Sequence, residues 1–129
     1  MEKGVRAPDR PEKLEMVWQE VIDLLLEYGK RILVGGRSMG GKFASKVVAN
    51  GAWADALALF AYPLHPPGKA DSVTDSHFAS IKVPTLFCSG DRDAFAKIEA
   101  LRLSVAKVDR AQLHAVSYTH LTLPTILLV

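Results

Sequence analysis

The sequence predicts an α/β fold, with a parallel sheet of about four strands and helices on both faces of the sheet. Short apolar runs alternate along the chain with segments of helical periodicity. These runs lack polar alternation, which is typical of strands covered on both faces. With 129 residues, 49% of them hydrophobic and 23% charged, the chain is large enough for one domain with its own core. Strands that alternate with helices imply right-handed crossovers, and such sheets bind ligands at the carboxyl ends of their strands.

A long amphipathic helix is expected first. Asp9 can cap this helix, Pro11 is tolerated in its first turn, and Glu12 has the spacing of a capping box. Gly29 is expected to end the helix. The apolar face is formed by residues at helical spacing, namely Leu14, Val17, Val21, Leu24 and Leu25.

The remaining elements follow in regular alternation. Strands are expected over residues 31–36, 56–62, 84–90 and 112–116, and helices over residues 39–50 and 95–106. A proline-rich loop over residues 63–69 leaves the second strand at the edge of the sheet where ligands bind. We expect Arg37, Tyr62 and His65 to line the rim of a pocket there; the alternative is that the loop is only a stiff connection.

The most informative motif is Gly36-Arg37-Ser38-Met39-Gly40, because an apolar run delivers one serine into a glycine-flanked turn that opens a helix. This pattern is typical of a nucleophile elbow, in which a side chain at either flanking glycine would collide with neighbouring backbone. Ser38 would then lie exposed at the helix N-terminus. Free amides and the helix dipole favour there the negative charge that develops during acyl transfer.

Two other interpretations of this segment stay open. Gly36, Gly41 and Lys42 fit most of the phosphate-binding P-loop pattern. Phe43, however, stands where that motif has the serine or threonine that holds magnesium, which argues against nucleotide binding. The segment can also be a glycine-rich turn between a strand and a helix, without chemistry.

Two carboxylates follow the third expected strand, at Asp91 and Asp93. A serine hydrolase needs an acid at such a position, because the acid orients the catalytic histidine and stabilises its cation. Asp93 fits this role better than Asp91. The alternative for either residue is an ordinary helix cap or turn aspartate.

Several segments together resemble those of one family. They are residues 6–11, 35–41, 62–69 and 81–87, followed by Gly90 and Asp93. Their order and spacing resemble the small, dienelactone-hydrolase-like α/β-hydrolases, in the branch with testis-expressed and histone-acetyltransferase-complex relatives. The resemblance covers residues 1 to about 116 and implies Ser38 as nucleophile, Asp93 as acid and the Met39 amide as one oxyanion donor.

The chain also departs from that family. Its members carry earlier strands and a loop with the second oxyanion amide, so we expect a partial α/β-hydrolase domain over residues 1–116, a fragment truncated at both ends and inactive or impaired by itself. Residues 117–129 lack any charged residue and resemble a non-native tail. His120 lies near the expected position of the catalytic histidine, although the residues that usually flank it are absent.

The other histidines are weaker candidates for a catalytic base. His114 lies within an expected strand, and His65 and His77 lie in a connecting segment, where surface or packing roles are expected. No pair of histidines has metal-ligand spacing with a third donor, so no metal site is expected. Cys88, the single cysteine, lies in an apolar run, where a small buried side chain is expected and not a catalytic thiol.

The charges indicate no nucleic-acid or membrane partner. Lys and Arg number 16 and Asp and Glu 14, and these residues are interspersed, so the sequence favours neither a nucleic acid nor a membrane surface. No apolar secretory segment follows Met1, and no stretch reaches the roughly 20 apolar residues of a spanning helix. A cytoplasmic location is expected.

These features predict a serine hydrolase that acts on a small-molecule ester or other acyl substrate through a Ser-His-Asp acyl-enzyme mechanism, with no cofactor. Ser38 would attack the carbonyl, a histidine would take its proton, and Asp93 would hold that histidine. The main alternative is a non-catalytic domain of the same fold that binds a protein partner.

Overall fold

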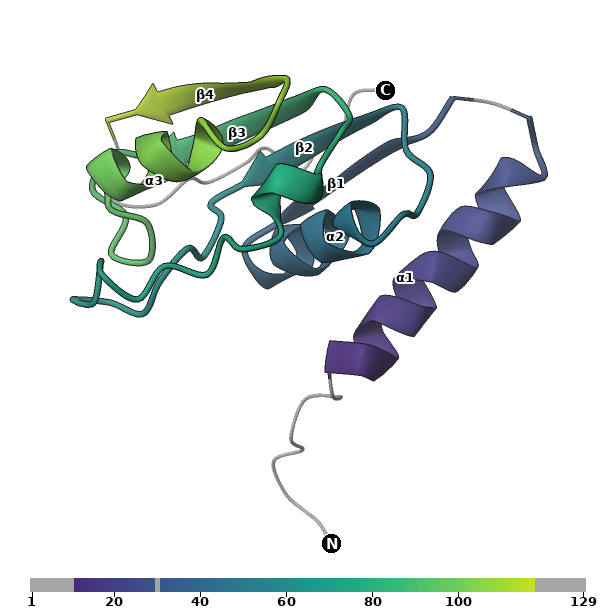
Figure 1. Ribbon diagram of the computed structural model, residues 1–129, viewed down its shortest axis with the longest axis horizontal. Helices are drawn as coiled ribbons and strands as arrows, with labels where there is room; N and C mark the ends of the chain where they lie inside the picture. Colours follow the sequence, from purple (N-terminus) through teal and green to yellow (C-terminus); the bar gives the residue numbers. More distant parts are fainter. Residues whose placement is uncertain (1–10, 30, 118–129) are drawn as a thin grey trace, which may run out of the picture.

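The computed structural model describes residues 11–29 and 31–117, except for the side chain of Pro11. The expected helix cap at Asp9 and most of the expected tail, including His120, lie outside the described residues. The elements in chain order are α1 (Pro11–Leu26), β1 (Leu33–Arg37), α2 (Met39–Ala49), β2 (Ala56–Phe60), the 3-10 helix η1 (Phe78–Ser80), β3 (Thr85–Gly90), α3 (Ile98–Val105) and β4 (Ala111–Val116) (Figure 1).

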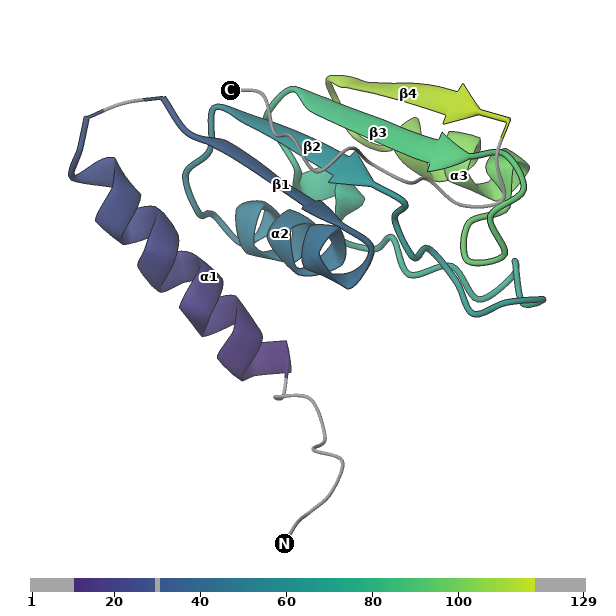
Figure 2. The same cartoon turned by 180° about the vertical axis from the view of Figure 1, so that it is seen from behind.

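The four strands form one parallel sheet in the order β1-β2-β3-β4 (Figure 2). The register aligns Arg37 with Phe60, Phe60 with Cys88 and Cys88 with His114. All carboxyl ends therefore meet at one edge of the sheet, and the turns after β1 and β3 lie at that same edge. The predicted fold class, a parallel sheet of four strands with helices, is confirmed.

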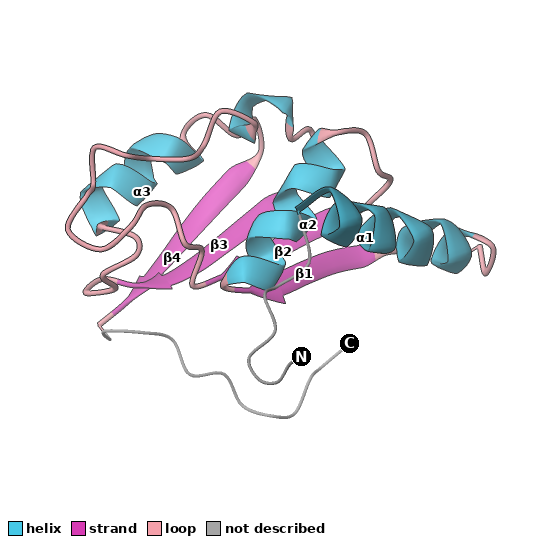
Figure 3. Cartoon of the chain, turned by 90° about the horizontal axis from the view of Figure 1, so that it is seen from below, coloured by secondary structure: helices cyan, strands magenta, loops and turns pink. Residues whose placement is uncertain are grey.

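The helices of the described residues all lie on one face of the sheet, which corrects the expectation that both faces are covered (Figure 3). Side chains on the covered face are buried, such as Leu59 and Phe87 at 0% exposure. Leu33 and Leu86 point to the opposite face, which we call the open face, and are 65% and 39% exposed. The strands carry apolar residues on both faces, so their composition gives no sign of this difference.

Helix α1 buries little of its apolar face. Ile22 is 1% exposed and joins the core, and Trp18 packs partly against it. The residues expected to form a buried stripe remain open: Val17, Val21, Leu24 and Leu25 are between 43% and 55% exposed. No described helix is long and apolar enough to cross a bilayer.

The core beneath the covered face is built around three aromatic rings. Tyr62, Phe78 and Phe87 are at most 1% exposed. Their ring centroids lie 5.4 Å apart for Tyr62 and Phe78 and 5.9 Å apart for Tyr62 and Phe87, both in edge-to-face geometry. This packing fixes the start of the long connection between β2 and β3 against the sheet.

Candidate active site

Ser38 occupies a sharp turn between β1 and α2. Its backbone has φ 54° and ψ −126°, a left-handed conformation that residues with a side chain rarely adopt. Its N–H donates to the Phe60 carbonyl at 2.8 Å, while its side chain is exposed and makes no capping hydrogen bond to α2. Such a conformation costs on the order of 1–3 kcal/mol and occurs preferentially at functional sites.

Glycines make this turn possible, because two backbone segments approach each other too closely there for a side chain. A Cβ on Gly36 would lie 2.6 Å from the carbonyl carbon of Gly40 and from the amide nitrogen of Gly41. A Cβ on Gly41 would lie 2.8 Å from the Gly36 carbonyl oxygen, whereas a Cβ on Gly40 would meet nothing within 4 Å. The sequence-based expectation of a collision is therefore right for Gly36 and wrong for Gly40, because the crowded partner is Gly41.

Met39 is the first residue of α2, so its amide has no acceptor within the helix. Its side chain is 51% exposed. The amide therefore lies directly after Ser38 at the positive end of the helix dipole, where negative charge is favoured. Arg37, expected at a pocket rim, is the exposed last residue of β1 and lies next to Ser38 in the chain.

Asp93 is held in the turn after β3 and is 9% exposed. Its Oδ1 accepts a hydrogen bond from the Phe95 amide at 2.9 Å, and its own N–H donates to the Gly90 carbonyl. No described residue donates to Oδ2, so one carboxylate oxygen is fixed and the other is available. Asp91 is exposed and makes only a long ion pair, at 3.9 Å, with the Nε of Arg92.

Backbone hydrogen bonds continue across the sheet beyond the strand ends. The Ser38 amide donates to Phe60, the Ala61 amide donates to Cys88, and the Asp91 amide donates to Val116. These hydrogen bonds fix both Ser38 and the Asp93 turn to the sheet, with β2 between them. Neighbouring strands lie about 4.8 Å apart, so roughly 10 Å separates the two turns across the sheet. An imidazole between the two side chains is the group that could connect them.

A family-wide sequence profile described as an alpha/beta hydrolase domain matches residues 1–120. The chain belongs to this family. No curated protein gives a significant sequence match.

Solved structures share the fold of this α/β hydrolase domain. A Paleococcus ferrophilus monoacylglycerol lipase superposes with a TM-score of 0.69 at 13% identity, over 88% of this chain and 67% of the lipase. The Pyrococcus furiosus esterase Pf2001 gives 0.72 at 19% identity, over 91% of this chain and 57% of the esterase. An α/β hydrolase from Sphaerobacter thermophilus superposes with a TM-score of 0.67 at 15% identity, over 93% of this chain and 72% of that hydrolase. The chain thus spans little more than half of the esterase.

None of the described histidines of this α/β hydrolase domain is free to act on Ser38. Both ring nitrogens of His65 make hydrogen bonds within the protein, and its residue is 5% exposed. His77 bonds to Ser45 and Tyr62. His114 is exposed on β4 and shares the open face with Leu86. His120, the predicted base, lies outside the described residues.

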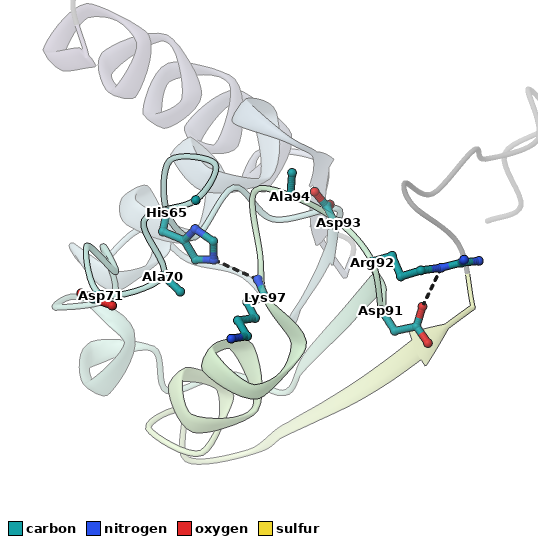
Figure 4. A pocket seen from close by; sticks show the side chains of 9 residues that line it. His65, Ala70, Asp71, Asp91, Arg92, Asp93, Ala94 and Lys97 are labelled. Atoms are coloured by element: carbon teal, nitrogen blue, oxygen red, sulfur yellow. Dashed lines mark hydrogen bonds and ion pairs between the residues drawn. The ribbon is translucent and has the colours of Figure 1, made fainter.

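A hollow of about 460 Å³ lies between the loop after β2 and the turn after β3 (Figure 4). His65 and Asp93 line it, together with Gly68, Ala70, Asp71, Asp91, Arg92, Ala94 and Lys97. Arg37 and Ser38 do not line it. Tyr62, expected at the rim of a pocket, is 1% exposed and belongs to the core instead.

A buried polar cluster behind α2 escaped the sequence analysis. Ser45 donates to the Lys42 carbonyl at 2.8 Å, and its oxygen also lies within hydrogen-bond distance of the Tyr62 hydroxyl, at 3.0 Å, and of His77 Nε2, at 2.8 Å. Ser45 and His77 are 32 residues apart in sequence. No local motif could have joined them.

The environment of this cluster keeps both ring groups neutral. Burial raises the pKa of Tyr62 to about 12, against the opposing effect of the Ser45 hydrogen bond. Burial, followed by the charges of Lys46 and Lys42, lowers the pKa of His77 to about 4. Burial and then Lys46 also lower the pKa of Lys42. His77 is therefore neutral at neutral pH and makes its hydrogen bond to Ser45 in that form.

The part of the chain that the structure describes offers little to hold a metal or a nucleotide. Within residues 11–29 and 31–117, no group of three His, Cys, Asp or Glu side chains is arranged to bind a metal ion. Phe43 is 9% exposed, in the position where a P-loop needs a magnesium-binding hydroxyl. Cys88 is half-buried, and this burial raises the pKa of its thiol, which lowers the share of reactive thiolate.

Proposed function

We propose that this α/β hydrolase domain is a serine acyl hydrolase with Ser38 as its nucleophile. The observation that carries the proposal is the Ser38 backbone, with φ 54°, in a turn that Gly36 and Gly41 make sterically possible. Backbone conformations of that cost cluster at functional sites, and in a nucleophile elbow the strained turn exposes the reactive serine. The exposed Ser38 side chain at the first turn of α2 fits this role.

The proposed reaction passes through an acyl-enzyme. The Ser38 oxygen attacks the carbonyl carbon of an ester while a histidine takes the serine proton, and the Met39 amide donates to the oxyanion. The tetrahedral intermediate collapses, the alcohol leaves with that proton, and water then releases the acid from Ser38 by the reverse sequence. Asp93 accepts a hydrogen bond from the histidine through its available Oδ2.

His120 is the histidine that we propose as the base, because His65, His77 and His114 are engaged elsewhere or lie on the open face. The proposed substrates are esters or related acyl compounds handled by the small, dienelactone-hydrolase-like branch of the family. The solved neighbours are named as a monoacylglycerol lipase and an esterase, which supports ester chemistry by analogy of fold.

Ester hydrolysis by purified protein tests the proposal. We expect hydrolysis of p-nitrophenyl acetate to fall to the uncatalysed rate in Ser38→Ala. Ser72→Ala is the matched control, because Ser72 is also exposed but lies in an ordinary turn after Lys69. Equal rates in the wild type and Ser38→Ala would contradict the proposal.

A non-catalytic domain that binds a protein partner is the second candidate. It is favoured by the exposed apolar side chains of α1 and of the open face, such as Leu24 at 55% and Leu33 at 65% exposure. In that case the wild-type protein would hydrolyse no ester, and Ser38→Ala would leave its binding to the partner unchanged.

A further inference from the structure

The two loops that border the hollow beside Asp93 are joined through one histidine. His65 follows β2 and lies between its own loop and the turn that leads into α3 (Figure 4). Its Nδ1 lies 2.8 Å from the Pro66 carbonyl oxygen, and its Nε2 lies 2.9 Å from the Lys97 amide nitrogen. With 5% exposure, His65 makes these contacts largely out of reach of water.

The partners of His65 determine its tautomer. A carbonyl oxygen can only accept and a backbone N–H can only donate. Nδ1 therefore carries the proton and donates to Pro66, while Nε2 is unprotonated and accepts from Lys97. The ring is neutral, and both of its nitrogens are occupied. His65 therefore cannot serve as the general base for Ser38.

The same contacts lead to the Asp93 carboxylate. The Phe95 carbonyl accepts from the amides of Leu64 at 2.9 Å and His65 at 3.0 Å. The Phe95 amide in turn donates to Asp93 Oδ1. Phe95 is thus held on its carbonyl side by the His65 loop, and Lys97, two residues later, is held by the His65 ring. The loop and the ring together fix the turn from residue 93 to residue 97.

We propose that His65 is a positioning residue for the acid of this site. Its ring fixes the turn that presents Asp93, so that Oδ1 stays bonded to Phe95 and Oδ2 stays available for the catalytic histidine. This inference rests on the proposed function. It assigns His65 a role through Asp93 and not through contact with substrate. Such a role can affect the rate because an error of about 1 Å in the position of a catalytic group can cost about 100-fold in rate.

Two substitutions separate the two hydrogen bonds of His65. His65→Gln keeps an acceptor near the position of Nε2, for the Lys97 amide, and loses the donor to Pro66. His65→Asn keeps a donor near the position of Nδ1, for Pro66, and loses the acceptor for Lys97. We expect kcat for p-nitrophenyl acetate to stay within about 3-fold of wild type in His65→Gln and to fall roughly 10-fold to 100-fold in His65→Asn, with KM nearly unchanged in both.

Two measurements on the wild-type chain do not depend on catalysis. The ¹⁵N chemical shifts of His65 should show a protonated Nδ1 and an unprotonated Nε2, and the Lys97 amide should exchange slowly with solvent. In His65→Asn that amide should exchange faster, and in His65→Gln it should remain protected. These readouts still decide the matter if His65→Asn proves poorly folded.

A protonated Nε2, or a kcat of His65→Asn equal to that of His65→Gln, would overturn the proposal. A wild type without esterase activity would overturn the proposed function, and the catalytic role of His65 with it. The chemical shifts and the Lys97 exchange rate would then still show whether the ring holds the turn, so the two failures are distinguishable.

Discussion

The turns that carry Ser38 and Asp93 lie at the same edge of the sheet but are stabilised by different means. The Ser38 turn depends on backbone contacts too close for any side chain, at Gly36 and Gly41. The Asp93 turn depends on hydrogen bonds from a distant loop, through Phe95 and Lys97. The first turn should therefore be sensitive to added atoms, and the second to lost donors and acceptors.

Among changes that leave the nucleophile in place, removing the charge of Asp93 should give the largest effect on activity. Asp93→Asn keeps an oxygen for the Phe95 amide but weakens the stabilisation of the histidine cation, so kcat should fall by about 10³-fold or more. Asp91→Asn is the matched control, because Asp91 is exposed and its ion pair with the Nε of Arg92 is long, at 3.9 Å. This variant should change kcat less than about 2-fold. Steady-state ester hydrolysis measures both. Equal losses in the two variants would remove the distinction between these carboxylates.

A methyl group added to the Ser38 turn should give the largest effect on stability. Gly41→Ala brings a Cβ within 2.8 Å of the Gly36 carbonyl oxygen, and we expect unfolding free energy to drop by about 1–3 kcal/mol. Gly40→Ala meets nothing within 4 Å in the same helix and should be neutral or stabilising by up to about 1 kcal/mol. Urea denaturation measures the pair. The explanation by close backbone contact fails if Gly40→Ala is the more harmful change.

The buried cluster behind α2 predicts that the stability of the protein depends on pH. The folded state holds the pKa of His77 at about 4, below the 6.5 of an unperturbed histidine. The unfolded chain therefore takes up the proton first, so this contribution to stability is complete above pH 6.5 and is lost as pH falls toward 4. His77→Gln keeps a hydrogen-bonding group for Ser45 that does not titrate, and the stability of this variant should decline less over that range.

The control for this pH effect is His114→Gln, because it makes the same exchange at an exposed histidine on β4, outside the buried cluster. Denaturation midpoints between pH 4 and pH 7 are the measurement. Parallel curves for the wild type and His77→Gln would show that His77 does not titrate differently in the two states.

The smallest expected effect concerns the backbone of Ser38 itself. Ser38→Gly relieves the cost of φ 54°, whereas Ser38→Ala keeps it, so the glycine variant should be more stable than the alanine variant by about 1 kcal/mol. Thermal melting of the two variants tests this difference. A more stable alanine variant would mean that the turn is not strained.

The contrast between the two turns also explains what could be predicted from the sequence. Gly36, Ser38 and Gly41 lie within six residues, so local spacing was enough to predict the elbow, although not to see that Gly40 is uncrowded. The fixed carboxylate of Asp93 depends on His65 and Leu64, which are about 30 residues away in sequence. Contacts over such distances arise from the fold and leave no local pattern.

The same reasoning applies to burial. Strand β2 is apolar throughout, which predicts two covered faces, yet the described helices cover only one. The spacing of Val17, Val21 and Leu24 likewise predicts an amphipathic helix without stating how much of its apolar face is buried. Composition indicates which side chains can be buried, and the tertiary contacts decide which of them are.

The most direct test of the central claim is the site of reaction with a fluorophosphonate, which phosphonylates an activated serine. Digestion and mass spectrometry of the treated wild type should locate a single adduct on the peptide that contains Ser38, and Ser38→Ala should carry none. An adduct on another serine, or an unmodified Ser38 in a folded protein that hydrolyses esters, would contradict the account.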